Sequence, residues 1–287
     1  ENTNVVLVVT QPDSYVGRKH ELKYTPVKEC ALKHNIPVSQ PEKVRKETDE
    51  ILKYNPDIII TCAYGQIIPS VLLDTPKYKA VNVHASLLPK LRGGSPLHRC
   101  IIDGYSETGV TIMYMAPGMD DGDIITQKSI KIEDTDNVGT IHDKLSIIGR
   151  DLLLETLPSI FNGTNGRTRQ DENEVTFAYN IKREEEKLDF NKTAREVFNH
   201  IRGMYPFPVS YTTLNGEIIK ICESKIGTKT SGTVGEIISI YDNGIGVKCS
   251  DTEIIITKLK PSGKKEMMAR DFINGRGKDK LLGEKLC

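Results

Sequence analysis

The chain has 287 residues, and its 39 Lys and Arg residues balance its 39 Asp and Glu residues, so the formal net charge is zero. A composition of 38% hydrophobic and 27% charged residues excludes a disordered chain. No apolar run is long enough to span a membrane, and the lack of Trp with only 6% aromatic residues argues against aromatic stacking as the main means of binding. The length predicts two domains.

The six cysteines are scattered, without a CxxC pair or the spacing of a zinc site. No signal peptide is recognisable at the start of the sequence. Because isolated thiols stay reduced inside cells, we expect a cytoplasmic protein with free cysteines.

The first half of the chain alternates strand and helix patterns. Continuous or alternating apolar runs predict strands over residues 5–9, 36–38, 57–62, 79–84, 109–115 and 124–132. Helices are predicted over residues 26–34, 49–54 and 140–156, the last with apolar side chains at helical spacing. Such alternation is typical of a doubly wound, mostly parallel α/β sheet with right-handed crossovers.

The pattern changes after about residue 161. A loop rich in Asn and Gly and an acidic stretch lead into one amphipathic helix, predicted over residues 193–204. Five short strands then follow at residues 209–213, 217–223, 235–240, 244–249 and 253–258, with hairpin turns at 215–216 and 242–244. Five strands fit a small OB-like β-barrel. We therefore expect a catalytic domain at 1–165, a linker at 166–181 and a C-terminal domain at 182–287.

The zero net charge conceals two unequal parts. Residues 1–180 carry 20 basic and 24 acidic side chains, a net charge of −4, and residues 181–287 carry 19 basic and 15 acidic side chains, a net charge of +4. Nine of those basic residues lie between Lys258 and the C-terminus, against four acidic ones. A solvated surface explains this excess as well as contact with a phosphate backbone does, so the charge alone does not decide.

Asn82 and His84 are the first candidates for chemistry. They lie two apart at the end of a predicted buried strand, so their side chains are expected on one side of it, at the edge where α/β sheets bind ligands. An Asn amide can donate to a developing oxyanion, and His can exchange a proton near neutral pH. On its own, an Asn-x-His pair more often satisfies backbone groups at a strand end.

Two loops strengthen the case for a site. The double glycine in Arg92-Gly93-Gly94-Ser95-Pro96 allows a close approach of backbone to a ligand, and Ser95-Pro96 is typical of a helix start. The acidic loop Asp120-Asp121-Gly122-Asp123 lacks the remaining positions of a calcium-binding loop, so we expect no metal there. One of its carboxylates is better placed to orient the imidazole of His84 and to favour its charged form.

Together these residues resemble the folate-dependent formyltransferase family. The shared motifs are Asn82-Val83-His84, Ser86-Leu87-Leu88-Pro89, Arg92-Gly93, Thr108–Met113 and Asp120-Asp121-Gly122-Asp123. Further segments resemble the branch of that family that acts on charged initiator tRNA: Thr10–Asp13, Gly17-Arg18, Pro26–Lys28, Ala63-Tyr64-Gly65, Ile68-Pro69 and Leu259–Lys265. The similarity covers essentially the whole chain.

The resemblance implies a Rossmann-like catalytic domain and a definite reaction. The formyl group of 10-formyltetrahydrofolate would pass to the α-amino group of methionine on initiator Met-tRNA, giving formylmethionyl-tRNA for translation initiation. Asn82 and protonated His84 would stabilise the oxyanion, and Asp120 would hold His84 charged and help remove the amine proton through water. The folate would lie across Ser86, Leu87, Leu88 and Pro89, and no metal would be needed.

The resemblance also implies how tRNA would be bound. Arg18 and Lys19 lie in a loop that would reach the acceptor end, and Lys264 and Lys265 lie in the basic C-terminal region. We expect a monomer without a membrane partner. The family normally begins with a further strand, a Gly-Thr-Pro loop and a helix, and we expect this sequence to start after that unit.

Three other functions remain open at this point. A relative that formylates a small amine, such as an amino-sugar nucleotide or glycinamide ribonucleotide, would use the same three catalytic residues. An enzyme that hydrolyses formyl-folate would need no tRNA loop, and a non-catalytic tRNA-binding protein would not need the catalytic residues. The basic C-terminal domain favours the tRNA substrate over the first two alternatives.

Overall fold

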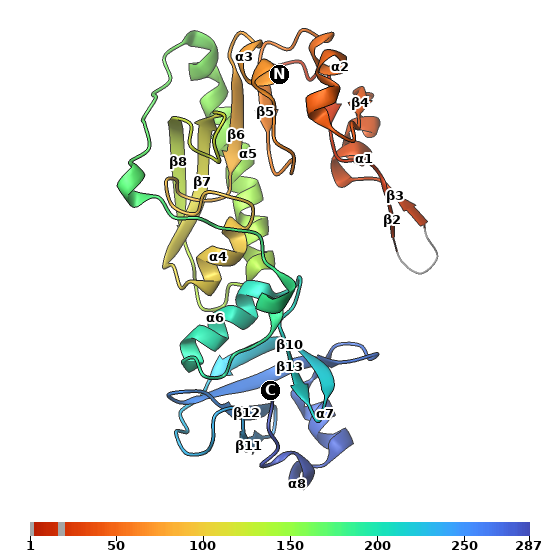
Figure 1. The fold of residues 1–287 in the computed structure, drawn as a ribbon, viewed down its shortest axis with the longest axis vertical. Coiled ribbons are helices and arrows are strands. Elements are labelled where there is room, and N and C mark those ends of the chain that lie inside the picture. Colours follow the sequence, from red (N-terminus) through yellow and green to blue (C-terminus); the bar gives the residue numbers. More distant parts are fainter. Residues whose placement is uncertain (1–2, 17–20) are drawn as a thin grey trace. The chain divides into compact units, whose positions relative to one another are not determined.

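The structure is a computed structural model that describes residues 3–16 and 21–287 (Figure 1). The chain divides into two compact units. The first unit consists of Glu1–Gly94, Val110–Lys128 and Gly149–Thr176, and the second of Ser95–Gly109, Ser129–Ile148 and Phe177–Cys287. Each unit is therefore built from segments that are separate in the sequence.

The N-terminal part of the chain forms short elements. They are β1 (Val8–Val9), β2 (Ser14–Val16), β3 (Glu21–Lys23), α1 (Pro26–Lys33), β4 (Val38–Ser39), α2 (Thr48–Leu52), β5 (Ile59–Thr61), α3 (Ser70–Asp74) and β6 (Ala80–His84). The predicted helix at 26–34 is confirmed by α1, which Thr25 caps by accepting a hydrogen bond from the Lys28 N–H. The β2–β3 hairpin was not predicted, because its side chains show no apolar pattern.

The central elements follow in the order α4 (Pro96–Ile102), β7 (Glu107–Tyr114), β8 (Ile124–Lys131) and α5 (Val138–Asn162). All four were expected from the sequence, and α4 begins after Ser95 with a proline in its first turn. Strands β5, β6, β7 and β8 form one sheet in that order, while β1 and β4 form a separate parallel pair.

The expected mostly parallel, Rossmann-like sheet is a mixed one, because it includes an antiparallel pair. Strand β5 runs parallel to β6, but β7 runs antiparallel to β6, with Asn82 opposite Met113 and His84 opposite Thr111. Alternating strand and helix patterns do not by themselves reveal that β7 returns along β6. The unit remains a Rossmann-like α/β domain, and β6 places Asn82 and His84 at its carboxyl end.

Helix α5 packs closely against this sheet at Gly149. A Cβ atom at Gly149 would lie 3.1 Å from Val83 Cγ1 and 3.7 Å from the Val110 methyl groups. The glycine therefore lets the helix backbone approach the buried faces of β6 and β7 closely.

The second unit contains an antiparallel sheet. Its elements are α6 (Ala194–Met204), β9 (Tyr211–Leu214), β10 (Glu217–Ile226), β11 (Ile237–Tyr241), β12 (Gly244–Lys248), β13 (Glu253–Pro261), β14 (Met267–Met268), α7 (Ala269–Arg276) and α8 (Lys278–Leu281). The strands pair in the order β11-β12-β13-β10-β9, with β14 added to β13. All five predicted strands and the predicted helix are confirmed (Figure 1).

The core of this unit lies between its helices and the sheet. Ile201 of α6, Ile221 of β10 and Ile256 of β13 are almost completely buried in one cluster. Gly203 on α6 faces α4, where a Cβ atom would come within 2.5 Å of Ile102 Cγ1, so glycine permits the close crossing of the two helices. Among the described residues the strand order is an open path, so a closed barrel is not detected.

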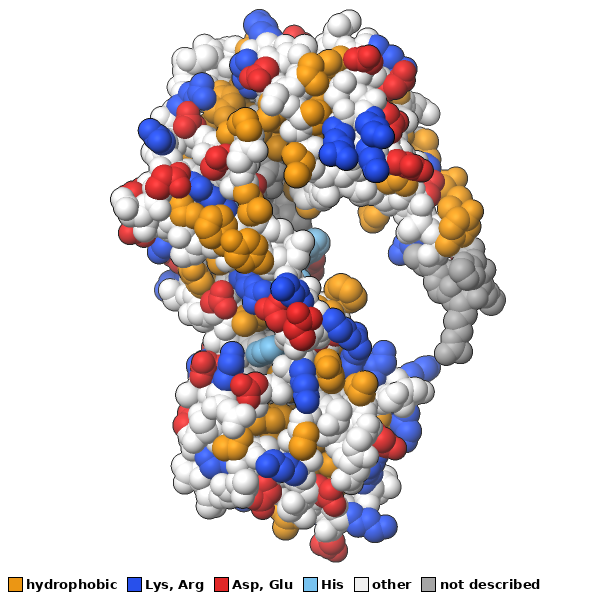
Figure 2. All heavy atoms as spheres, in the orientation of Figure 1, with side chains coloured by type: hydrophobic (Ala, Val, Ile, Leu, Met, Phe, Trp, Pro, Cys, Tyr) orange, Lys and Arg blue, Asp and Glu red, His pale blue; other side chains and the backbone are white. Residues whose placement is uncertain are grey.

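Charges of both signs cover the surface. On the face shown in Figure 2, Lys and Arg side chains lie on both units with Asp and Glu side chains among them. Within residues 3–16 and 21–287, no helix is long and apolar enough to cross a membrane.

Candidate active site

Asn82 is fixed by the strand beside it. The register of β5 and β6 places Thr61 opposite Asn82, and the Thr61 hydroxyl donates a hydrogen bond of 2.9 Å to Asn82 Oδ1. Because the amide oxygen is engaged in this way, its Nδ2 donor points away from Thr61 and is free to meet a substrate atom. Sequence reasoning missed Thr61, although the residue lies near the end of the strand predicted over residues 57–62.

His84 is buried, and one of its two ring nitrogens is held by a hydrogen bond. Nε2 lies 3.1 Å from the carbonyl oxygen of Leu91, which can only accept, so Nε2 carries the proton of this hydrogen bond. Nδ1 lies 3.7 Å from Oδ2 of Asp120, which is close enough for an ion pair and too long for a hydrogen bond. Nδ1 is thus the nitrogen that can turn to a substrate.

Asp120 reaches His84 from the loop between β7 and β8. Its backbone has a φ of 49°, a left-handed conformation that few residues other than glycine adopt. Its Oδ2 accepts a hydrogen bond of 2.8 Å from the Gly93 N–H. The structure therefore brings together the three predicted catalytic side chains, two from β6 and one from this loop.

The segment proposed for folate binding has an inner and an outer side. Ser86 and Leu88 are buried, and Thr111 links them by donating to the Ser86 carbonyl at 2.6 Å and accepting from the Leu88 N–H at 3.1 Å. Leu87 and Pro89 are only partly buried. Surface for a ligand is thus offered mainly by Leu87 and Pro89, while Ser86 and Leu88 hold the turn in shape.

The residues predicted to contact tRNA lie in different places. Arg18 and Lys19 lie outside the residues that the structure describes. Lys264 and Lys265 are exposed in the turn that joins β13 and β14, and neither takes part in an ion pair found among the described residues. Lys258, by contrast, is paired with Glu223 and Glu266.

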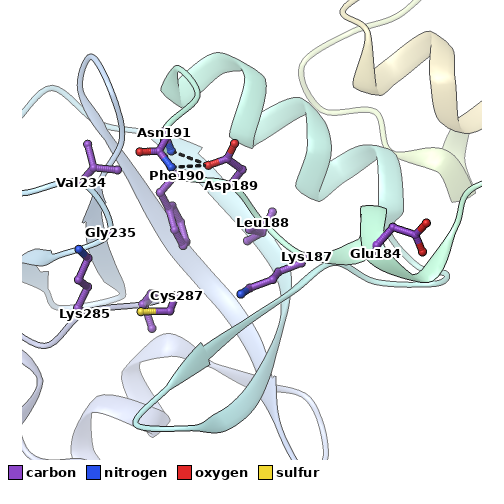
Figure 3. A pocket seen from close by; sticks show the side chains of 11 residues that line it. Glu184, Lys187, Leu188, Asp189, Phe190, Asn191, Val234, Gly235, Lys285 and Cys287 are labelled. Carbon is purple, nitrogen blue, oxygen red and sulfur yellow. Dashed lines mark hydrogen bonds between the residues drawn. The ribbon is translucent and has the colours of Figure 1, made fainter.

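In the part of the chain that the structure describes, no candidate metal centre is found, and a cavity in the second unit lies away from the predicted site residues. No group of three or more His, Cys, Asp or Glu side chains there is placed to hold a metal ion. A cavity of about 520 Å³ lies within the second unit, and Figure 3 shows Lys187, Phe190, Lys285 and Cys287 on its walls. None of the predicted site residues lines it.

Comparison with known proteins identifies this arrangement. Residues 1–157 match the formyl transferase family, and residues 180–277 match the formyl transferase C-terminal domain. The chain belongs to the formyltransferase family. The resemblance stated from the motifs is therefore confirmed, and with it the Rossmann-like catalytic fold.

Comparison with individual formyltransferases shows which branch of the family this chain is similar to. Methionyl-tRNA formyltransferase of Bacillus subtilis (strain 168) is 51% identical over 275 residues, which cover 94% of this chain and 87% of that protein. Methionyl-tRNA formyltransferase of Staphylococcus aureus (strain MW2) is 49% identical over 287 residues, covering 99% of this chain and 92% of that protein. The tRNA-acting branch named from the sequence is the one that these formyltransferases represent.

A solved structure shows the same fold at low identity. HypX from Aquifex aeolicus, crystallised with tetrahydrofolic acid, superposes on this formyltransferase with a TM-score of 0.63 and 18% identity. The match covers 84% of this chain and 43% of HypX. At this identity the likeness supports the fold alone.

Proposed function

We propose that the protein transfers the formyl group of 10-formyltetrahydrofolate to the α-amino group of methionine on initiator Met-tRNA. The observation that carries the proposal is the convergence of Asn82, His84 and Asp120 in a chain about half identical, over nearly its full length, to methionyl-tRNA formyltransferases. The product, formylmethionyl-tRNA, serves translation initiation.

The reaction needs no covalent enzyme intermediate, because the neutral amine is itself a nucleophile. Its attack on the formyl carbon places negative charge on the formyl oxygen. Asn82 Nδ2 and a proton on His84 Nδ1 are the donors that meet this oxyanion, since Asn82 Oδ1 and His84 Nε2 are already bonded elsewhere. The tetrahedral centre then collapses as the bond between the formyl carbon and N10 of the folate breaks, and the proton lost by the amine ends on N10 of the departing tetrahydrofolate.

Asp120 supports this chemistry with its negative charge. Its Oδ2 lies 3.7 Å from His84 Nδ1, so the carboxylate faces the ring nitrogen that is proposed to donate to the oxyanion. The same carboxylate can receive the amine proton through water. We place the folate against Leu87 and Pro89, with Ser86 and Leu88 shaping the turn.

The second unit is proposed to bind the body of the tRNA through an OB-like domain. Replacing Lys264 and Lys265 by Ala should weaken Met-tRNA binding. The negative slope of log K against log salt concentration should also become shallower by about one per lysine, because each phosphate contact that is lost contributes about one unit to it. Filter binding of Met-tRNA over a range of salt concentrations measures both effects.

A matched control removes the same charge elsewhere. Lys43 and Lys46 are exposed in the first unit, and replacing both by Ala should leave the salt slope unchanged. Equal slopes for the Lys264/Lys265 variant and the wild-type protein would exclude these two lysines as phosphate contacts. Arg18 and Lys19 stay in the proposal as contacts to the acceptor end.

The choice of acceptor is tested by offering several amines. With 10-formyltetrahydrofolate as donor, initiator Met-tRNA should be formylated, whereas free methionine, an amino-sugar nucleotide and glycinamide ribonucleotide should not. Formylation of a small amine in preference to Met-tRNA would overturn the proposed substrate. We further propose that the protein acts in the cytoplasm, as a monomer and without a membrane partner.

A further inference from the structure

The segment Thr168–Thr176 lies between the two parts of the chain that match known domains, residues 1–157 and 180–277. Its composition predicts only a linker. In the structure it belongs to the first unit and contacts the two loops that hold the catalytic groups. We propose that it is a positioning element of the active site, in which Gln170 holds Asp120 and Arg92 orients Gln170. The inference rests on the proposed function.

Gln170 holds the Asp120 loop by its backbone. The side chain is only 4% exposed, and its Nε2 donates hydrogen bonds of 2.7 Å to the Asp120 carbonyl and 2.8 Å to the Gly122 carbonyl. Both amide hydrogens are therefore used on one short stretch of loop. Because Asp120 adopts a left-handed backbone conformation, which costs free energy, it needs contacts of this kind to stay in place.

Arg92 determines which way the Gln170 amide points. Its guanidinium is buried, and its Nε donates a hydrogen bond of 2.9 Å to Gln170 Oε1. A guanidinium can only donate, so it selects the oxygen of the amide and leaves the nitrogen to face the loop carbonyls. Glu172, 3.1 Å from the outer end of Arg92, balances its charge.

The same segment is also linked to His84, through Leu91. Thr176 Oγ1 accepts a hydrogen bond of 2.9 Å from the Leu91 N–H, and the Thr176 carbonyl accepts one of 2.9 Å from the Arg92 N–H. The Leu91 carbonyl is the group that holds His84 Nε2. The segment thus supports both catalytic side chains indirectly. It holds Asp120 through backbone carbonyls of the Asp120 loop, and it holds His84 through Leu91.

The segment is anchored to the sheet at its start. Ile124 and Thr168 exchange two backbone hydrogen bonds, of 2.8 Å and 2.9 Å, directly after the Asp120 loop. Gln170 is therefore supported by the strand that begins where the loop ends. This geometry assigns a positioning role rather than contact with the substrate.

The variant Gln170→Glu tests the inference. It keeps an acceptor for Arg92 but replaces the donor with an oxygen that faces two carbonyl oxygens. We expect kcat to fall about 10-fold to 100-fold, as for other groups that orient a catalytic residue, with unchanged KM for both substrates. A normal kcat, or a change in KM alone, would overturn the inference.

Two comparisons separate positioning from general damage. Gln127 is a matched amide that donates to the Leu88 carbonyl at 2.8 Å, so Gln127→Glu should raise KM for formyl-folate more than it lowers kcat. Asn173→Asp adds the same charge at an exposed position of the segment itself and should leave both constants unchanged. If Gln170→Glu does not fold, Gln170→Met keeps the volume without the amide, and a full kcat in that variant overturns the inference.

A double-mutant cycle shows whether Gln170 acts through Asp120. If it does, Asp120→Asn combined with Gln170→Glu should be no slower than Asp120→Asn alone. Independent, multiplying losses overturn the inference while leaving the proposed function intact. A normal rate for Asp120→Asn by itself overturns both, because the group to be positioned would then have no catalytic role.

Discussion

Replacing Asn82 by Ala is expected to lower kcat by about 10²–10³, the usual cost of losing one oxyanion donor. The loss should appear at saturating concentrations of both substrates, because the amide acts on charge that develops only in the transition state. Steady-state formylation of Met-tRNA measures kcat and KM separately. A variant with normal kcat and a raised KM would show that Asn82 binds substrate without stabilising the oxyanion.

Thr61 provides the control for this result. Thr61→Val removes the hydroxyl that fixes Asn82 Oδ1 but leaves the amide present. The kcat of Thr61→Val should fall, but by less than the kcat of Asn82→Ala. The Asn82 amide is still present in this variant and can donate to the oxyanion in some of the orientations that it then adopts. A larger loss for Thr61→Val than for Asn82→Ala would mean that the Thr61 hydroxyl itself carries the chemistry.

Gly122→Ala is expected to lower kcat by about 100-fold, although residue 122 has no reactive group. A Cβ atom there would lie 2.0 Å from the Tyr114 carbonyl oxygen, a backbone atom that is held in β7. The loop must therefore shift and carry Asp120 away from His84, and a displacement of about 1 Å costs about that factor. Turnover at saturating substrate, with thermal unfolding as a check on the fold, measures the effect.

Gly166→Ala is the matched control. The nearest atom to its added Cβ would be the Ile125 carbonyl oxygen, at 3.9 Å, an ordinary contact. This variant should keep normal kcat and KM. Equal activity of the two alanine variants would contradict the view that the backbone of the Asp120 loop is held rigidly.

The elements that local patterns describe could be predicted from the sequence. The buried run that forms β6 and the apolar face of α6 depend on side chains close together in the chain, and both are found where expected. The side chains of β3 are exposed, and the direction of β7 depends on its pairing with β6, so neither the β2–β3 pair nor that direction leaves a local signal.

The same distinction applies to the site. Asn82 and His84 could be paired from the two-residue period of a strand, and Asp120 was added from a resemblance. The groups that hold them could not be found in this way. Thr61 meets Asn82 from another strand, and Gln170 meets the Asp120 loop from a segment 50 residues further along the chain. Contacts between distant residues are fixed by packing rather than by spacing.

The central claim is that Asn82, His84 and Asp120 together transfer the formyl group. The most direct test is the turnover of Asp120→Asn with saturating 10-formyltetrahydrofolate and initiator Met-tRNA. Removing the charge 3.7 Å from His84 Nδ1 while keeping the side-chain shape should lower kcat by about 100-fold or more, with little change in tRNA affinity. Near-normal turnover by this variant would contradict the account.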